Sequence, residues 1–156
     1  MRILLSLAAL AASAGVAIAA DTAGTWVPVV YNADGVGLVD VAHLQLKGGL
    51  TTVRMAVVLR APDAAKPRSA AIALITEEVD CKAGTGRGMG NVILDLAGAE
   101  LGRTPASGAM APVDPTSNLG KMVTAACNPP SNPPESYPDV LSARKGVLAH
   151  LAAGGT

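Results

Sequence analysis

The stretch CKAGTGRGMGNVILDLAG, residues 81–98, carries alternating glycines of the kind that a phosphate-binding loop uses. Counted from Gly84, the third glycine of a dinucleotide fingerprint is replaced by Met89, and a strand-like segment follows where that fingerprint needs a helix. A P-loop would need Gly-Lys-Ser or Gly-Lys-Thr at the start of a helix. We therefore expect no nucleotide site but a mobile connection between two strands, on which Arg87 is an exposed contact for a ligand.

Two carboxylates, Glu78 and Asp80, would project from the same face of a strand. A pair of this kind can act in general acid–base catalysis when a partner group is positioned beside it. The sequence offers no such partner, and a solvated strand face is the better explanation of the pair. We expect no catalytic role for either residue.

His43 follows Asp40 by three residues in LVDVAHL, and a His–Asp pair could activate a serine as a nucleophile. Neither Ser69 nor Ser107 lies in the tight glycine-flanked turn that presents a nucleophilic serine. We expect His43 to be a surface or edge-strand histidine. A small hydrolase that gathers His43 with Asp40 or Glu78 in one pocket is the least favoured function.

The N-terminus has the features of a secretory leader. Arg2 precedes an apolar run over residues 3–16, and a small-residue cleavage site follows. We expect a signal peptide over residues 1–20, cleaved after Ala19 or Ala20. The mature chain would then have no stable membrane span and would lie in the periplasm, at the cell surface or outside the cell.

The only two cysteines, Cys81 and Cys127, can pair in the oxidising compartment to which export leads. His43 and His150 have no ligand-like spacing to them, so a zinc site is not indicated. The methionines are too scattered to suggest copper or haem. We expect one disulfide, no metal and no cofactor.

Charge and aromatic content limit the partners. The chain has 12 Lys and Arg against 12 Asp and Glu, a balance that argues against nucleic acid or an anionic membrane surface. One Trp, two Tyr and no Phe leave few stacking platforms for bases or sugars.

Hydrophobic periodicity predicts strands first and a helix afterwards. Residues 51–60, TTVRMAVVLR, alternate with a period of two, which is typical of a half-buried strand. The other predicted strands are 26–32, 38–44, 69–81, 91–96 and a return strand from Glu100. Residues 61–69 contain two prolines and predict an exposed loop, a second candidate contact region.

After Pro115 the apolar period becomes helical, and Cys127 falls on the buried face of the predicted helix. The stripe comprises Leu119, Met122, Val123, Ala126 and Cys127. The predicted fold is α+β: an antiparallel β-sheet with one packed helix near the C-terminus, stapled by a single disulfide. Residues 128–156 read as a proline-rich linker and a short segment weakened by Gly146, which is either a docking helix or a frayed tail.

The ordered set of these features resembles the surface-adhesin protein E family of secreted Gram-negative proteins. The likeness covers about residues 26–127. It rests on Trp26, Asp40 with His43, Val79-Asp80-Cys81, Arg87, Asp95 to Gly98, Met110 to Ser117, and Cys127. Met110 stands where the family usually has Trp. The resemblance implies the same sheet-and-helix fold and the same Cys81–Cys127 pair.

Well-known members of that family bind host matrix and plasma proteins, some of them as dimers. We therefore expect residues 21–127 to form a secreted, non-enzymatic domain that recognises a host matrix protein or a bacterial envelope protein, with a homodimer as one possible state. The alternative is a periplasmic accessory protein that binds another envelope protein through residues 128–156. This chain lacks the family's second Trp, so no ligand-binding residue is carried over.

Overall fold

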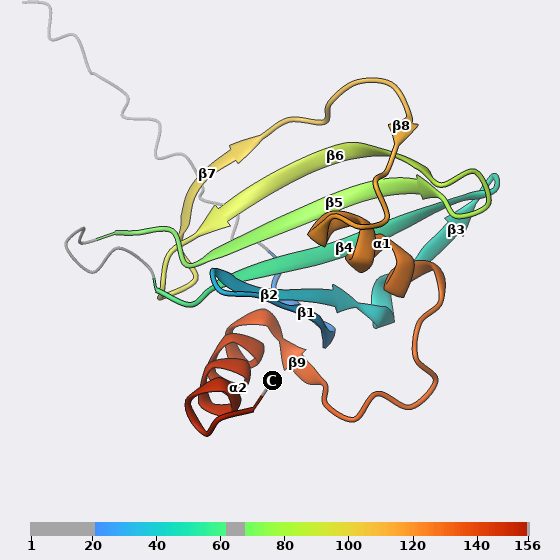
Figure 1. Cartoon of the computed structure of the whole chain (residues 1–156). Coiled ribbons are helices and arrows are strands. Elements are labelled where there is room, and N and C mark those ends of the chain that lie inside the picture. The colour runs from blue at the N-terminus through green and yellow to red at the C-terminus, as the bar shows by residue number, and fades with distance from the viewer. Residues whose placement is uncertain (1–20, 62–67, 156) are drawn as a thin grey trace, which may run out of the picture.

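The computed structural model describes residues 21–61 and 68–155. The predicted leader and most of the predicted 61–69 loop lie outside these residues. In the described part, nine strands form one sheet and two α-helices pack on it (Figure 1). No helix in that part is both long and apolar enough to cross a membrane.

All strand pairs of the sheet are antiparallel, in the order β7-β6-β5-β4-β2-β1-β9, with β3 beside β4 and β8 beside β6. The strands are β1 (Ala23–Tyr31), β2 (Gly35–Asp40), β3 (Gln45–Lys47), β4 (Leu50–Leu59), β5 (Ile72–Asp80), β6 (Thr85–Leu94), β7 (Glu100–Thr104), β8 (Ala111–Pro112) and β9 (Tyr137–Asp139). The helices are α1 (Asn118–Cys127) and α2 (Val140–Ala152), and a 3-10 turn, η1 (Val41–His43), follows β2. The predicted α+β class is confirmed, with a second helix in addition.

Strand β4 lies within the sheet and is buried on both faces. Val53 and Met55 belong to one apolar cluster, which includes the buried side of α1. Ala56 and Val58 belong to the other cluster, which includes the buried side of α2. Because neighbouring strand residues point to opposite faces, the two helices cover opposite faces of the sheet, called here the α1 face and the α2 face. The strand predicted to be half-buried from the period of two is therefore buried on its second face as well at Ala56 and Val58, where the α2 cluster covers it, whereas Arg54 on that face stays partly exposed.

Helix α1 begins after Ser117, whose hydroxyl accepts a hydrogen bond from the Gly120 N–H at 2.9 Å. Met122 and Ala126 are buried against the α1 face. The helix ends at Cys127, which is bonded to Cys81 with their Cα atoms 5.7 Å apart. The predicted disulfide is confirmed.

Two details of this junction differ from expectation. Leu119 is 37% exposed because the first turn of α1 approaches the chain's own Asp114–Pro115 backbone rather than the sheet. Cys81 is exposed because it lies in the turn after β5 instead of on that strand. The disulfide therefore fastens α1 at the rim of the sheet and not from inside the core.

The glycine-rich stretch is a strand, so the mobile connection predicted there is wrong. The turn is confined to residues 81–84, and β6 starts at Thr85. Strand β6 pairs with β5 along one edge and with β7 and β8 along the other. Hydrogen bonds along both edges hold the glycines extended in spite of their low strand propensity. Leu96, predicted on the same strand, lies beyond its end and is 56% exposed.

The last segment is a docking helix. Asp139 caps α2 by accepting a hydrogen bond from the Ser142 N–H at 2.8 Å. The hydrogen bonds from the Ser142 hydroxyl and from the Ser142 N–H lower the pKa of the Asp139 carboxyl. The inward residues of α2, Val140, Ala143 and Val147, are fully buried. Gly146 permits this packing because a Cβ there would lie 2.2 Å from the Tyr137 ring.

The disulfide closes a chain separation of 46 residues, so we expect its loss to cost up to about 4 kcal/mol of unfolding free energy in the chain-entropy model. The Cys81→Ser, Cys127→Ser double variant should therefore unfold at lower urea concentration with a similar dependence on urea. Adding reductant to the parent protein should give the same shift. An unchanged midpoint in both cases would contradict a stabilising role for the bond.

Residues 137–152 supply an edge strand and part of the core, so they cannot be removed as a separate tail. A chain ending at Asn128 should lose cooperative thermal unfolding, because it lacks β9 and the three buried α2 residues. A chain lacking only residues 154–156 is the matched control and should keep its transition. A cooperative transition in the longer deletion, followed by circular dichroism, would show that α2 is dispensable.

Candidate functional site

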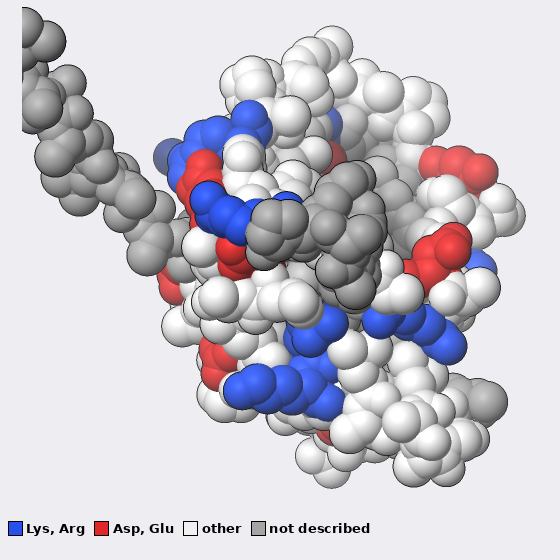
Figure 2. All heavy atoms as spheres, turned by 90° about the vertical axis from the view of Figure 1, so that its left-hand side faces the viewer, with Lys and Arg blue, Asp and Glu red and all other residues white. Residues whose placement is uncertain are grey.

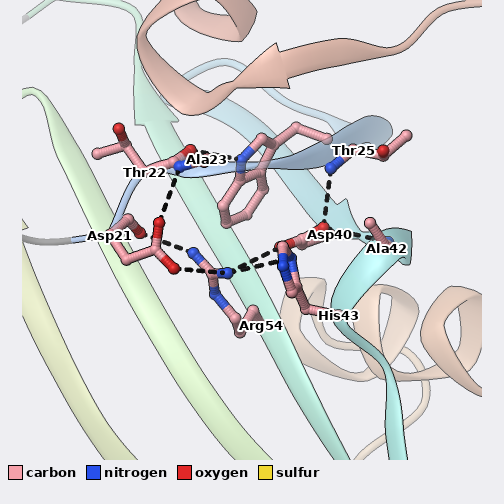
Figure 3. Close-up of polar contacts among 9 residues, drawn as sticks. Asp21, Thr22, Ala23, Thr25, Asp40, Ala42, His43 and Arg54 are labelled. Atoms are coloured by element: carbon pink, nitrogen blue, oxygen red, sulfur yellow. Dashed lines mark hydrogen bonds and ion pairs between the residues drawn. The ribbon is translucent and has the colours of Figure 1, made fainter.

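A fully buried carboxylate, Asp40, ends strand β2 on the α2 face (Figure 3). Its Oδ1 accepts hydrogen bonds from the Thr25 N–H at 2.9 Å and the Ala42 N–H at 3.1 Å. Its Oδ2 lies 2.7 Å from Nδ1 of His43 and 3.2 Å from Nη1 of Arg54. Both oxygens are thus compensated, as a buried charge requires. The chain comes so close here that a Cβ on Gly24 would lie 2.5 Å from the carboxylate.

His43 was predicted on a strand over residues 38–44, but β2 ends at Asp40 and His43 lies in η1. Along a strand, positions three apart point to opposite faces, whereas the 3-10 turn brings His43 back over Asp40. With Asp40 ionised, the 2.7 Å contact is a hydrogen bond when Nδ1 carries a proton and donates it to the carboxylate; Nη1 of Arg54 lies 3.2 Å from the same nitrogen. In the neutral ring, Nε2 is then the nitrogen that can accept a hydrogen bond, and the side chain is 42% exposed.

Arg54 connects this carboxylate to the start of the described chain. Its Nη2 donates to the Asp21 carbonyl oxygen at 2.6 Å, and its Nη1 lies 3.4 Å from the Asp21 carboxylate. The guanidinium carbon lies 5.5 Å from the centroid of the Trp26 ring, within cation–π range. The indole N–H of Trp26 in turn donates to the Thr22 carbonyl at 2.9 Å. The segment before β1 is therefore held against β4 by the same arginine that compensates Asp40.

A groove of about 480 Å³ lies on the sheet, and one of its walls is formed by Asp21, Trp26, His43 and Arg54. Arg54, Thr76 and Gly90 are direct neighbours across β4, β5 and β6, so the groove runs across the strands. The described residues that line it are Asp21, Trp26, His43, Gln45, Arg54, Met55, Leu74, Ile75, Thr76, Gly90, Val92 and Arg103. We call this feature the sheet-face groove; it offers apolar surface beside several donors.

Arg103 contributes a second guanidinium to the groove from β7. It pairs with Glu100, with Nη2 to Oε2 at 2.6 Å and Nε to Oε1 at 2.8 Å. Hydrogen bonding and charge from Arg103 lower the pKa of the Glu100 carboxyl, and the same contact raises the pKa of Arg103. Both cations of the groove are therefore held in place by carboxylates.

The residues selected from the sequence reach different places. Arg87 is not on an exposed loop: it lies in β6 and its Nε donates to Glu78 at 2.7 Å. Asp80 instead accepts two backbone N–H groups of the turn that follows it. Glu78 and Asp80 are thus engaged separately and neither lines the sheet-face groove. Ser107 lies in a different depression, beside Glu77.

Arg54 is a site residue that was not predicted from the sequence, although Asp40 and His43 were considered together. Its position opposite Asp40 follows from the β2–β4 register, in which Val39 pairs with Met55. A charged residue in an otherwise apolar strand was the available signal. Partner strands cannot be assigned from one sequence, so that signal could not identify Asp40 as its partner.

Asp40→Asn should lower the unfolding free energy by about 3 to 5 kcal/mol, because it leaves Arg54 near an uncharged group in a buried site. The amide would direct its N–H donors at Arg54 and His43 if its oxygen kept the backbone bonds. Asp34→Asn, on an exposed turn, is the matched control and should change little. Equal urea midpoints for the two variants would contradict the structural role of Asp40.

Comparison with protein-family models, with curated proteins and with solved structures finds no match for this chain. The likeness to the surface-adhesin protein E family stays a prediction from the residues that carry it. The interpretation of the site accordingly depends on its own geometry.

Proposed function

We propose that this chain is an exported, non-enzymatic binding domain that recognises a protein ligand through the sheet-face groove. The observation that carries the proposal is the groove itself: about 480 Å³ of mixed apolar and polar lining on a rigid sheet. A ligand loop would place an apolar side chain against Leu74 and Val92 and polar groups against Arg54, Arg103 and Nε2 of His43. Such a mixture of apolar and polar lining is typical of specific binding sites.

The electrostatics of the molecule support a specific protein partner. Asp40 and Asp21 compensate Arg54, and Glu100 compensates Arg103. Figure 2 shows acidic and basic side chains interspersed over the end of the molecule turned to the viewer. Recognition would therefore depend on shape and on directed hydrogen bonds more than on a field of one sign.

The disulfide supports the proposed export. Disulfides form and persist in oxidising compartments and are rare in the cytosol. The Cys81–Cys127 bond is therefore typical of a protein of the periplasm, the cell surface or the extracellular space. Whether the protein ligand is a host matrix protein or another bacterial envelope protein is decided by the experiment below.

A second function, a small hydrolase, is favoured by the Asp40–His43 contact. A buried carboxylate that holds Nδ1 of a histidine orients Nε2 as a general base. Among the described residues that line the groove, the side-chain hydroxyl available to such a base belongs to Thr76, and neither serine nor cysteine is present. Ester hydrolysis by the purified protein that is abolished in His43→Ala would favour this function over binding.

Filling the groove tests the binding proposal. Thr76→Tyr places an aromatic ring in the groove from the middle of the sheet, where Tyr has good strand propensity. We expect at least a roughly tenfold loss of affinity for the protein ligand, since anchors at the centre of an interface dominate binding. The ligand is sought by saturation binding of purified host matrix proteins and of solubilised envelope fractions.

Thr104→Tyr is the matched control, because Thr104 is exposed on β7 and does not line the groove. It should bind as the parent does, and both variants should keep the parent's thermal transition. Saturable binding to matrix proteins alone identifies an adhesin, and binding to an envelope protein alone identifies an accessory protein. Absence of saturable binding to either set, or equal affinities of the two tyrosine variants, would contradict the proposal.

A further inference from the structure

A second cavity, away from the sheet-face groove, lies where β1, the proline-rich segment and the end of α2 meet. It has a volume of about 460 Å³ and is lined by Pro28, Tyr31, Pro134, Glu135 and His150. None of these residues lines the sheet-face groove. The two sites can therefore be tested independently.

Aromatic faces are gathered around this cavity although the chain has few aromatic residues. The rings of Tyr31 and His150 have their centroids 6.4 Å apart and are tilted by 48°. Tyr137, the chain's other tyrosine, stands behind Glu135 and donates its hydroxyl hydrogen bond to Oε1 of that residue. The backbone of Gly155 lies close to the exposed His150 ring, since a Cβ added at Gly155 would lie 2.1 Å from Nε2. Two aromatic rings, tilted relative to each other, therefore form part of the cavity lining.

The cavity also contains one carboxylate without a cationic partner in the described residues. Glu135 makes no ion pair with any described Lys, Arg or His. Both tyrosines have a raised pKa. Burial is the main cause for each; the charge of Glu135 adds to the shift of Tyr31, and the hydrogen bond to Glu135 adds to that of Tyr137. Both phenols are therefore uncharged at neutral pH. Glu135 is the acidic residue in the lining of this cavity.

We infer that this cavity binds a quaternary ammonium cation of the choline type. Electron-rich ring faces attract a cation, and a nearby carboxylate adds a second attraction. A primary ammonium or a guanidinium needs directed acceptors for each N–H group, and one oxygen of the Glu135 carboxylate already accepts the Tyr137 hydroxyl. A quaternary ammonium has no N–H group to satisfy, and its methyl groups fit against Tyr31, Pro28 and Pro134. We call this feature the Tyr31–Glu135 cavity.

Choline can be presented free in solution or as a lipid headgroup, and the experiment separates these sources. The exported chain is titrated with choline chloride through the millimolar range while its Tyr31 and His150 ring signals are followed by NMR. 3,3-Dimethylbutanol, the uncharged isostere of choline, is titrated in parallel. We expect saturable shifts with choline and at least roughly tenfold weaker binding of the alcohol, because the alcohol lacks the charge.

Variants locate the binding. Tyr31→Leu and Glu135→Gln should each weaken choline binding roughly tenfold, whereas Tyr31→Phe keeps the ring face and should bind as the parent does. Glu77→Gln, on the α1 face, is the matched acid-to-amide control and should have no effect. Because Tyr31 is 36% exposed, its replacement should leave the fold intact, as a thermal transition can verify.

Cosedimentation with phosphatidylcholine vesicles then assigns the source. Capture of the parent, but not of Glu135→Gln, identifies the lipid headgroup, and choline binding without capture identifies a soluble ligand; both support the inferred chemistry. No saturable choline binding, equal binding of the uncharged isostere, or unchanged binding in Tyr31→Leu would overturn it. Thr76 does not line the Tyr31–Glu135 cavity, so Thr76→Tyr should leave choline binding unchanged. A failure of choline binding therefore does not contradict protein binding by the sheet-face groove.

Discussion

The structure depends on one buried charge. Asp40 has no exposed surface, and its carboxylate is stable there only because two backbone N–H groups, His43 and Arg54 surround it. The contacts come from the start of β1, from the turn after β2 and from the middle of β4. The same charge therefore fixes the entry to the sheet, orients the imidazole and places a guanidinium in the sheet-face groove. The contacts that satisfy the buried carboxylate therefore also position His43 and Arg54 in the wall of the groove.

The two helices are fastened to the sheet by different means. Helix α1 reaches the α1 face at the end of a long connection, and a covalent bond to the β5 turn limits how far it can separate. Helix α2 follows directly from β9, so the antiparallel pairing of β9 with β1 positions it without a crosslink. Gly146 lets that helix lie close on Tyr137. The α2 face is consequently covered at one end and open at the other, and the open part is the groove.

The features predicted correctly from the sequence are those that depend on residues close together in the chain or on a single possible pairing. The period of two in β4, the helical stripe before Cys127 and the single possible cysteine pairing were sufficient for the fold class. The pattern was insufficient where a tertiary contact reverses a local preference. Glycines weaken strands and helices in isolation, yet β6 is held by neighbours on both edges and Gly146 is required by Tyr137. The Asp40–Arg54 pair depends on strand register, which one sequence does not supply.

The scarcity of aromatic residues explains where the two candidate sites lie. The core consists mainly of Val, Leu, Ile, Met and Ala, with few large rings. The helices therefore lie close to the sheet to fill the space that large aromatic side chains fill in other cores. Trp26 is fully buried beneath Arg54 and forms part of the wall of the groove. Tyr31 and Tyr137 lie instead where the C-terminal segment meets β1, with Glu135 between that segment and the strand. Each ring is thus near a charged group, and the sheet-face groove and the Tyr31–Glu135 cavity are the hollows that combine rings with charges; the depression beside Ser107 has no aromatic residue among the described residues that line it.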